Sequence, residues 1–357
     1  MNKPILSAML CVALATGALA GCADQQSAET ASASEAEITA VQESTVAEAE
    51  TQTEAQSATF TASTASVSAV EGGLVDATEL FTERDLTQGA DTSGATTYTV
   101  ESGKDIEITE EGVYVLTGTA EDATITVNAE DSAKVQLVLN DLNITNESEA
   151  AIYVVSADKV FITLADGTTN TLTTTSEFVA DGDTNVDGVV FAKDDLVLNG
   201  TGTLVVNSSA NGIVGKDDVK ITGGTYEITA ENHAIQGKDS VAIADGTFTL
   251  QAGKDGIHAE NSDDTTKGYV YIGGGTFQVV AASDGIEGDA FVQIDGGALS
   301  IDAGEGIEGT YVQVNGGAAN INASDDGINA TSKATAYDIP TIEINDGTIT
   351  VTMGAGD

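Results

Sequence analysis

Apolar and polar residues alternate in short runs through most of the chain after about residue 106. Residues 226–230, 248–252, 277–281 and 299–303 each carry an apolar side chain at every second position. A period of two indicates β-strands that bury one face and expose the other. No stretch of this region has the 3.6-residue period or the length of a helix, so we expect it to be all-β.

Two sequence markers repeat at nearly the same interval. The first is a polar residue, then Gly (once Ala), then Ile, and its steps are 22, 22, 29, 21 and 21 residues. Its members begin at Asn211, His233, Asp255, Asp284, Glu305 and Asp326. The second marker, Gly before Thr or Ala, recurs at nearly the same intervals as the first, including the longer interval of 29 residues. A repeat that holds three short strands predicts a solenoid, and the usual handedness of parallel crossovers predicts a right-handed parallel β-helix.

The alternation assigns the aromatic side chains of the repeats to the interior. They lie in phase with the aliphatic residues, at Tyr226, Phe248 and Phe277. The same position in later repeats is Leu299, Ala319 and Ile349. We therefore expect a stack of core residues rather than an exposed aromatic platform for sugars. The positions between them are mostly Thr, Ser, Asn and Gln, and predict a flat polar outer face.

The N-terminal residues have the pattern of a bacterial lipoprotein signal. Lys3 precedes an apolar stretch too short to span a bilayer, and Leu19-Ala20-Gly21-Cys22 follows it. This tetrapeptide matches a lipobox, in which Cys22 is lipidated after cleavage; the alternative is an ordinary secretory signal. We expect residues 1–21 to be the signal peptide, and the protein to be lipid-anchored at the cell membrane, on the extracytoplasmic side or cell surface.

Three further segments complete the expected organisation. Residues 22–72 are rich in Ala, Ser, Thr and Glu, with few large apolar residues, and are expected to form a disordered linker. Residues 73–105 are expected to cap the solenoid, and residues 106–357 to form it. Solenoids need a polar cap, and residues 350–357 lead up to another acidic turn without one. We therefore expect the chain to be truncated at its C-terminal end.

The balance of charge narrows the choice of partners. The chain has 57 acidic residues against 12 Lys and Arg, a formal net charge of −45. Neutralising phosphates requires a basic surface, so a nucleic-acid binder is excluded. Anionic polysaccharides would be repelled unless a divalent cation lay between them and the protein. The alternative is that the negative field serves only solubility and attracts cations without specificity.

The strongest candidate site is a column of carboxylates at the acidic turns. Its members are Asp255, Asp284, Glu305 and Asp326, joined by Glu287 and Glu308 three positions after a turn and by Asp325 beside one. Stacked coils would bring like charges within several ångströms, where they repel unless a cation intervenes. Oxygen ligands from several turns suit Ca²⁺, which is the expected cofactor. The alternative is that these are local turn residues, with Gly supplying a positive φ.

Three other features are weaker candidates. Lys-Asp pairs recur at residues 193–195, 216–218 and 238–240, as surface ion pairs or as a second cation or sugar site. Insertions at residues 261–267 and 330–340 should project from one edge, and loops of this kind often carry binding specificity. For catalysis, only Lys254 beside Asp255 suggests a base that could abstract a proton next to a uronate carboxyl.

Several segments, in the same order along the chain, resemble a known family. They are residues 74–78, 112–119, 135–141, 151–154, 164–168, 193–196 and the Asp-Gly-Ile turns. Together they resemble the bacterial carbohydrate-binding parallel β-helix domain, which is related in fold to the family 9 pectate lyases, over about residues 73–357. The resemblance implies bound Ca²⁺, affinity for cellulose-like or polygalacturonate-type glycans, and display as a lipoprotein. It implies calcium contacts at Asp255, Asp284 and Asp326, whereas Asn211 and His233 replace the acid in other repeats.

Three hypotheses about function follow. The first is a lipid-anchored, Ca²⁺-dependent, non-catalytic polysaccharide-binding protein that acts as a monomer. The second is a Ca²⁺-dependent lyase of the pectate type, with Lys254 as its base. The third is a structural surface protein or adhesin without affinity for glycans. Retention on polysaccharides, with and without a chelator, separates the first hypothesis from the third.

Overall fold

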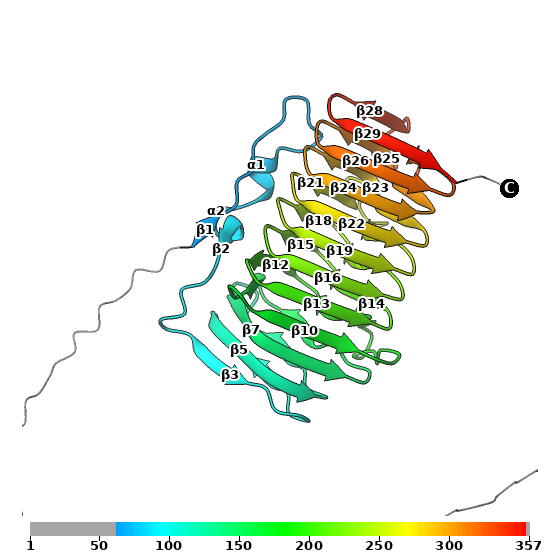
Figure 1. The fold of residues 1–357 in the computed structure, drawn as a ribbon. Coiled ribbons are helices and arrows are strands. Elements are labelled where there is room, and N and C mark those ends of the chain that lie inside the picture. The colour runs from blue at the N-terminus through cyan, green and yellow to red at the C-terminus, as the bar shows by residue number, and fades with distance from the viewer. Residues whose placement is uncertain (1–61, 355–357) are drawn as a thin grey trace, which may run out of the picture. The chain divides into compact units, whose positions relative to one another are not determined.

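The computed structural model describes residues 62–354, and within them it is a stack of parallel coils. Figure 1 shows the coils following one another from the cyan N-terminal end to the red C-terminal end. Almost every strand pairs in parallel with its equivalents in the neighbouring coils. The predicted parallel β-helix is confirmed. The expected signal peptide, Cys22 and most of the expected linker lie outside the described residues.

Each coil contributes strands to three faces, which we name by their outward side chains. The threonine face contains β10 (Thr169–Thr174), β13 (Thr203–Ser208), β16 (Thr225–Ala230), β19 (Thr247–Ala252), β22 (Thr276–Ala281), β24 (Ala298–Ala303), β26 (Ala318–Ala323) and β29 (Thr348–Met353). The acidic face contains β4 (Ile106–Ile108), β6 (Ile125–Asn128), β8 (Ile152–Ser156), β11 (Gly188–Ala192), β14 (Asn211–Gly215), β17 (Ile235–Gly237), β20 (Ile257–Ala259) and β27 (Ile328–Ala330).

The third face, the strap face, is covered by an N-terminal segment described below. It contains β3 (Thr96–Thr99), β9 (Lys159–Leu164), β12 (Asp195–Gly200), β15 (Asp218–Ile221), β18 (Ser240–Ile243), β21 (Tyr269–Ile272) and β28 (Thr341–Ile344). Four long strands turn a corner and serve two faces. They are β5 (Gly112–Glu121) and β7 (Lys134–Asn146), which end on the threonine face, and β23 (Asp284–Ile294) and β25 (Glu305–Val314), which begin on the acidic face.

The strand register confirms the predicted core. Tyr226 pairs with Phe248, and Phe248 pairs with Phe277, inside the solenoid. Their rings stack with centroids 5.2 and 4.6 Å apart, and all three side chains are buried. The column continues through aliphatic residues in later coils, as the sequence indicates. Each of these strands buries alternate side chains, and in β16 they are Tyr226, Ile228 and Ala230.

Residues 63–89 form a strap that runs along the strap face. It contains β1 (Ser63–Thr64), α1 (Ala77–Leu80), α2 (Glu83–Leu86) and β2 (Thr87–Gln88), and β1 pairs with β2. Neither helix is long and apolar enough to cross a membrane, nor is any other in the described chain. Figure 1 shows α1 and α2 beside the edges of successive coils.

The strap is fixed by side chains of the coils that it crosses. Gln293 bonds both the amide and the carbonyl of Val75, at 2.8 and 3.2 Å, and Phe81 packs on Tyr271. Two differences from the expected organisation follow. Residues 63–72 belong to the folded body rather than to a linker, and the first part of the expected cap lies along the solenoid rather than over its end.

The two insertions in the repeat lie on one edge, as expected. Residues 261–267 follow β20, and residues 331–340 follow β27. They meet across the intervening coils, because the hydroxyls of Thr265 and Thr335 are 3.0 Å apart. Between them β23 and β25 pass round the corner without any loop. The insertions therefore bracket the part of the acidic face where the carboxylates are densest.

Candidate functional site

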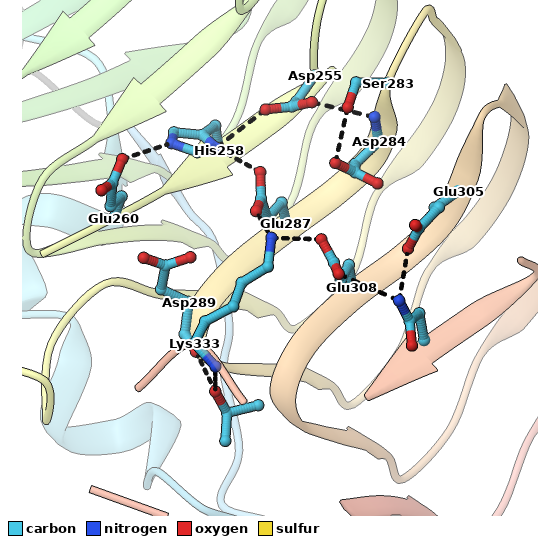
Figure 2. A network of polar contacts seen from close by, with 12 residues as sticks. Asp255, His258, Glu260, Ser283, Asp284, Glu287, Asp289, Glu305, Glu308 and Lys333 are labelled. Atoms are coloured by element: carbon cyan, nitrogen blue, oxygen red, sulfur yellow. Dashed lines mark hydrogen bonds and ion pairs between the residues drawn. The ribbon is translucent and has the colours of Figure 1, made fainter. Parts of the chain in front are cut away.

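Two columns of outward side chains run along the acidic face. The first is the acidic-turn column: Asn211, His233, Asp255, Asp284, Glu305 and Asp326. The second lies three residues further along each strand and is in register from coil to coil: Val214, Gln236, His258, Glu287, Glu308 and Asn329. Figure 2 shows the two columns where their side chains approach one another.

Glycine at the acidic turns is required by packing, and not by backbone conformation. A Cβ on Gly256 would lie 2.6 Å from the carbonyl oxygen of Gly285, and a Cβ on Gly285 would lie 2.6 Å from that of Gly306. None of these three has a positive φ, whereas Gly246 and Gly275 of the other marker do. The local-turn interpretation, with Gly supplying a positive φ, is therefore wrong. Close stacking of the coils is what brings the acidic side chains together.

Asp255 and His258 form the N-terminal end of the cluster. The Oδ2 atom of Asp255 lies 2.9 Å from Nδ1 of His233 and 3.0 Å from Nδ1 of His258, and its Oδ1 accepts the amide of Asp284. Burial opposes ionisation of Asp255, but these contacts outweigh it and hold its pKa far below the usual range. Burial likewise favours neutral His258, but Asp255 and Glu287 raise its pKa to about 10.

Lys333, from the second insertion, enters the cluster between two coils. Its ammonium pairs with Glu287 and with Glu308, and its side chain is 26 % exposed. The amides of Lys333 and Ala334 both donate to the hydroxyl of Thr310, which fixes the loop. Burial disfavours the charged lysine, yet the two carboxylates raise its pKa above the usual value. Figure 2 shows this side chain lying across the acidic face.

Asp284, Glu305 and Glu308 lie at the other end, where Lys333 pairs with Glu308 but no ion pair of the described residues includes Asp284 or Glu305. Asn329 donates to Glu305 at 2.9 Å and to Glu308 at 3.2 Å, and the hydroxyl of Ser283 donates to Asp284. Burial, followed by the charges of Asp255 and Glu287, raises the pKa of Asp284 to about 7. Asp284 is therefore repelled by neighbouring acids, Glu308 among them, more than its hydrogen bond from Ser283 compensates.

Three groups of side chains in the described chain place ligand atoms within 4.8 Å of one another and could hold a metal ion. They are His233, Asp255 and His258; Asp255, Asp284 and Glu287; and Asp284, Glu305 and Glu308. The second and third groups offer oxygen atoms alone and fit a hard divalent cation, and only the third has a member, Glu305, that is partly exposed. The three groups together contain five carboxylates, and their only cationic or imidazole neighbours among the described residues are Lys333, His233 and His258. Such an excess of carboxylates is the arrangement expected where a cation completes the site. The five are Asp255, Asp284, Glu287, Glu305 and Glu308.

The remaining predicted site residues lie apart from these groups. Asp325 and Asp326 are exposed, and neither belongs to the three clusters. Both take part in described hydrogen bonds only through the backbone: the amide of Asp325 donates to Gly304, and the carbonyl of Asp326 accepts from Gly306. Lys254 is exposed, although Asp255 next to it is buried, and no ion pair of the described residues includes it. The structure therefore places Lys333, rather than Lys254, among the carboxylates.

Sequence reasoning missed three residues of the cluster. His233 occupies the acidic-turn column, and His258 follows Asp255 by three positions, as Glu287 follows Asp284. That shared offset was the available signal for His258. Lys333 had no such signal, because it lies in an insertion whose path depends on its bonds to Thr310.

A second acidic group lies where the acidic face meets the strap face, in the column of Lys-Asp pairs. Burial, followed by the neighbouring Asp239, raises the pKa of Asp217 to about 7. Asp239 is paired with Lys267 of the first insertion and accepts a bond of 2.5 Å from Asn261. Lys267 of the first insertion therefore supplies a positive charge to this group, as Lys333 of the second insertion does for Glu287 and Glu308.

Comparison with known proteins agrees with this fold. The model of the carbohydrate-binding domain-containing protein family matches residues 102–357. A carbohydrate-binding domain-containing protein of Acetivibrio thermocellus is 38 % identical over 130 residues, which are 36 % of this chain and 46 % of that protein. The matched segment thus spans less than half of the relative.

A solved structure is also similar in fold. It is the polysaccharide lyase-like protein from C. thermocellum, in its gadolinium derivative, with 28 % sequence identity and a TM-score of 0.54. The match covers 71 % of this chain and 99 % of that one. The family match, the fold and the coil register agree over the same residues. The chain belongs to the family of carbohydrate-binding domain-containing proteins.

Proposed function

We propose that the protein binds polysaccharide without cleaving it, that Ca²⁺ completes its binding site, and that a lipid on Cys22 holds it at the cell surface. The observation that carries the calcium proposal is the group of Asp284, Glu305 and Glu308. It offers only oxygen ligands, from adjacent coils, and only one of its members, Glu308, is paired with a cation among the described residues. Ca²⁺ accepts irregular shells of six to eight oxygens, as such a group supplies.

Calcium bound at this group would also bind the carboxylates of an acidic glycan directly. A bound Ca²⁺ supplies positive charge on a face that otherwise repels anions, and a uronate carboxylate can share it. Glu305, which is only partly buried, places this group next to solvent. Polygalacturonate-type chains are the ligands that this chemistry favours.

A neutral glycan would bind to a different surface, the threonine face. Its central outward column is exposed and nearly free of charge: Glu227, Thr249, Gln278, Ser300 and Asn320. Successive coils place these hydroxyls and amides about 4.8 Å apart. A flat, regular array of small polar groups suits an extended, uncharged chain, which supports the cellulose-like alternative within the same function.

The anchoring proposal rests on sequence alone. Leu19-Ala20-Gly21-Cys22 has the form of a lipobox. Metabolic labelling with a radioactive fatty acid tests it: label should enter the wild-type protein and be absent from a Cys22→Ser variant. Label in both proteins would contradict lipidation at this cysteine.

A lyase remains the second candidate, because a similar solved structure is described as polysaccharide lyase-like. The residue proposed as its base, Lys254, is exposed and unpaired with any described carboxylate. Lys333 lies among carboxylates, but they raise its pKa and so keep it protonated. A lysine in that state is a poor base, and this favours binding over cleavage.

Paired variants test the proposed binding surfaces. Glu305→Gln removes an oxygen ligand and should abolish Ca²⁺-dependent retention on polygalacturonate, while leaving retention on cellulose unchanged. Thr249→Trp places a bulky group on the threonine face and should have the opposite effect. If Glu305→Gln and Thr249→Trp are both retained on both glycans at wild-type levels, the assignments of the acidic face and of the threonine face are both wrong. Unsaturated products, detected by ultraviolet absorbance, would establish the lyase instead.

A further inference from the structure

We propose that His233, Asp255 and His258 form a second metal site, selective for a transition ion such as Zn²⁺ rather than for Ca²⁺. His233 precedes β17, and Asp255 and His258 come from the next coil, where His258 lies in β20. Imidazole nitrogen is a preferred ligand of Zn²⁺, Cu²⁺ and Ni²⁺, whereas Ca²⁺ prefers oxygen. This inference does not depend on the function proposed above.

Two of the three distances between ligand atoms lie close to the spacing that such an ion needs, and all three atoms lie within 4.8 Å of one another. Both Nδ1 atoms approach the same oxygen of Asp255, His233 at 2.9 Å and His258 at 3.0 Å. Zinc–ligand bonds of 2.0–2.1 Å in a tetrahedron separate neighbouring ligand atoms by about 3.3 Å. Each contact would therefore open by only a few tenths of an ångström. The two imidazole rings stack with centroids 4.3 Å apart, which holds both on the same side of Asp255.

The site is buried and contains an unsatisfied nitrogen. The side chains of His233, Asp255 and His258 are 12 %, 4 % and 9 % exposed. Nδ1 of His233 lies 2.9 Å from Oδ2 of Asp255, yet it is buried without a hydrogen-bond partner in the described chain. Buried polar atoms are nearly always paired, so an orphaned ligand nitrogen facing a carboxylate points to a cation between them.

A second buried atom without a partner belongs to the neighbouring column. The Oε1 atom of Gln236 is also buried without a partner among the described residues, and Gln236 is the register neighbour of His258. Both residues with an unsatisfied atom thus come from the coil next to His258, one stacked on its ring and one its register neighbour. The competing explanation is a protonated His258 held between Asp255 and Glu287, the latter 2.8 Å from its Nδ1. That explanation accounts for His258 but leaves the nitrogen of His233 without a partner.

Metal binding by the full chain tests the proposal. Cys11→Ser and Cys22→Ser remove the two thiols that would compete for the ion, and a chelator removes metal carried through purification. We expect one equivalent of Zn²⁺ to bind and to resist a thousandfold excess of Ca²⁺, which displaces ions held only by surface carboxylates. Co²⁺ in the same site should give the intense visible absorption of a tetrahedral complex. Zinc that is fully displaced by Ca²⁺, or Co²⁺ with only a weak octahedral spectrum, would overturn the proposal.

Variants assign the site to its residues. His233→Ala should weaken Zn²⁺ binding about a hundredfold or more, since loss of a ligand exceeds the usual effect of an outer-shell change. Glu231→Gln is the matched control, because it removes an exposed charge two residues away and should leave the affinity unchanged. Equal affinities in the two variants would contradict the assignment. The Co²⁺ spectrum of the chain with intact histidines decides the question even if His233→Ala fails to fold.

Discussion

Buried carboxylates of this protein are stabilised in two different ways. Asp255 and Glu287 have lowered pKa values, because histidine and lysine contacts outweigh the cost of burial. Asp284 and Asp217 have raised values, because burial and neighbouring acids dominate. The first pair favours folding while ionised. The second pair keeps its protons to a higher pH than usual, unless a cation stabilises the ionised form.

We expect a bound metal ion to replace the positive charge of Lys333 when that side chain is removed. Lys333→Met keeps most of the side-chain volume but leaves Glu287 and Glu308 without their shared cation. Because the side chain is 26 % exposed, we discount the loss for solvent screening and expect about 1–2 kcal/mol of destabilisation in chelated protein. Millimolar Ca²⁺ should restore most of it. Denaturant unfolding, with and without Ca²⁺, measures both effects.

The matched control for this change is Lys254→Met. Lys254 is exposed and belongs to no described ion pair, so its loss should alter stability by less than about 0.5 kcal/mol. If both variants lose the same stability, or if Ca²⁺ restores neither, the role assigned to Lys333 is wrong.

Asp217 makes stability depend on pH. Its pKa is raised from 3.8 to about 7, so the folded protein holds a proton that the unfolded chain releases. Its contribution therefore favours folding fully below about pH 4 and is lost as the pH rises through 7. Asp217→Asn removes this dependence. Thermal midpoints at pH 4, 5.5 and 8 should show the variant gaining on the wild type as the pH rises, and parallel curves would contradict this.

At the scale of elements, the coil and the strap are held by different forces. Coils stack through backbone ladders and a thin aliphatic interior, and Gly256 and Gly285 allow their close approach on the acidic face. The strap contributes few buried residues, and its backbone is bound by Gln293 and Gln313. A segment with few buried contacts is expected to open before the structure beneath it.

Phe81 tests whether the strap opens separately. It is buried against Tyr271, and Phe81→Ala should cost about 3 kcal/mol, near the lower end for a buried phenylalanine because the strap forms only a small cluster. We expect limited proteolysis to cut residues 72–89 at least tenfold faster, while the β-sheet signal in circular dichroism persists. A Thr225→Ala change on the threonine face serves as control. Simultaneous loss of strap and sheet would show that the two unfold together.

The coils were predictable from sequence, and the strap was not. Period-two alternation and two markers that shift together determine which residues share a column, as the pairing of Tyr226 with Phe248 shows. The strap has no such period, and it binds polar side chains 218 residues away. Likewise, the column of acids was predictable from its spacing, whereas Lys333 reaches it through a loop that tertiary bonds alone define.

At the scale of the whole molecule, charge is distributed unevenly over the three faces of the solenoid. The chain has a net charge of −45, yet the central column of the threonine face carries one carboxylate, Glu227, in the five coils from β16 to β26. The strap covers a second face, and the third concentrates buried acids. Such a field repels anions everywhere except where a bound cation reverses it.

The most direct test of this account is retention of the wild-type protein on insoluble polysaccharides. The full chain is mixed with cellulose and with cross-linked polygalacturonate, in Ca²⁺ or in chelator, and both the protein left in solution and the release of unsaturated sugar are measured. The account predicts retention without release, and loss of retention on polygalacturonate when Ca²⁺ is removed. Absence of retention on both glycans in Ca²⁺, or steady release of unsaturated product, would contradict it.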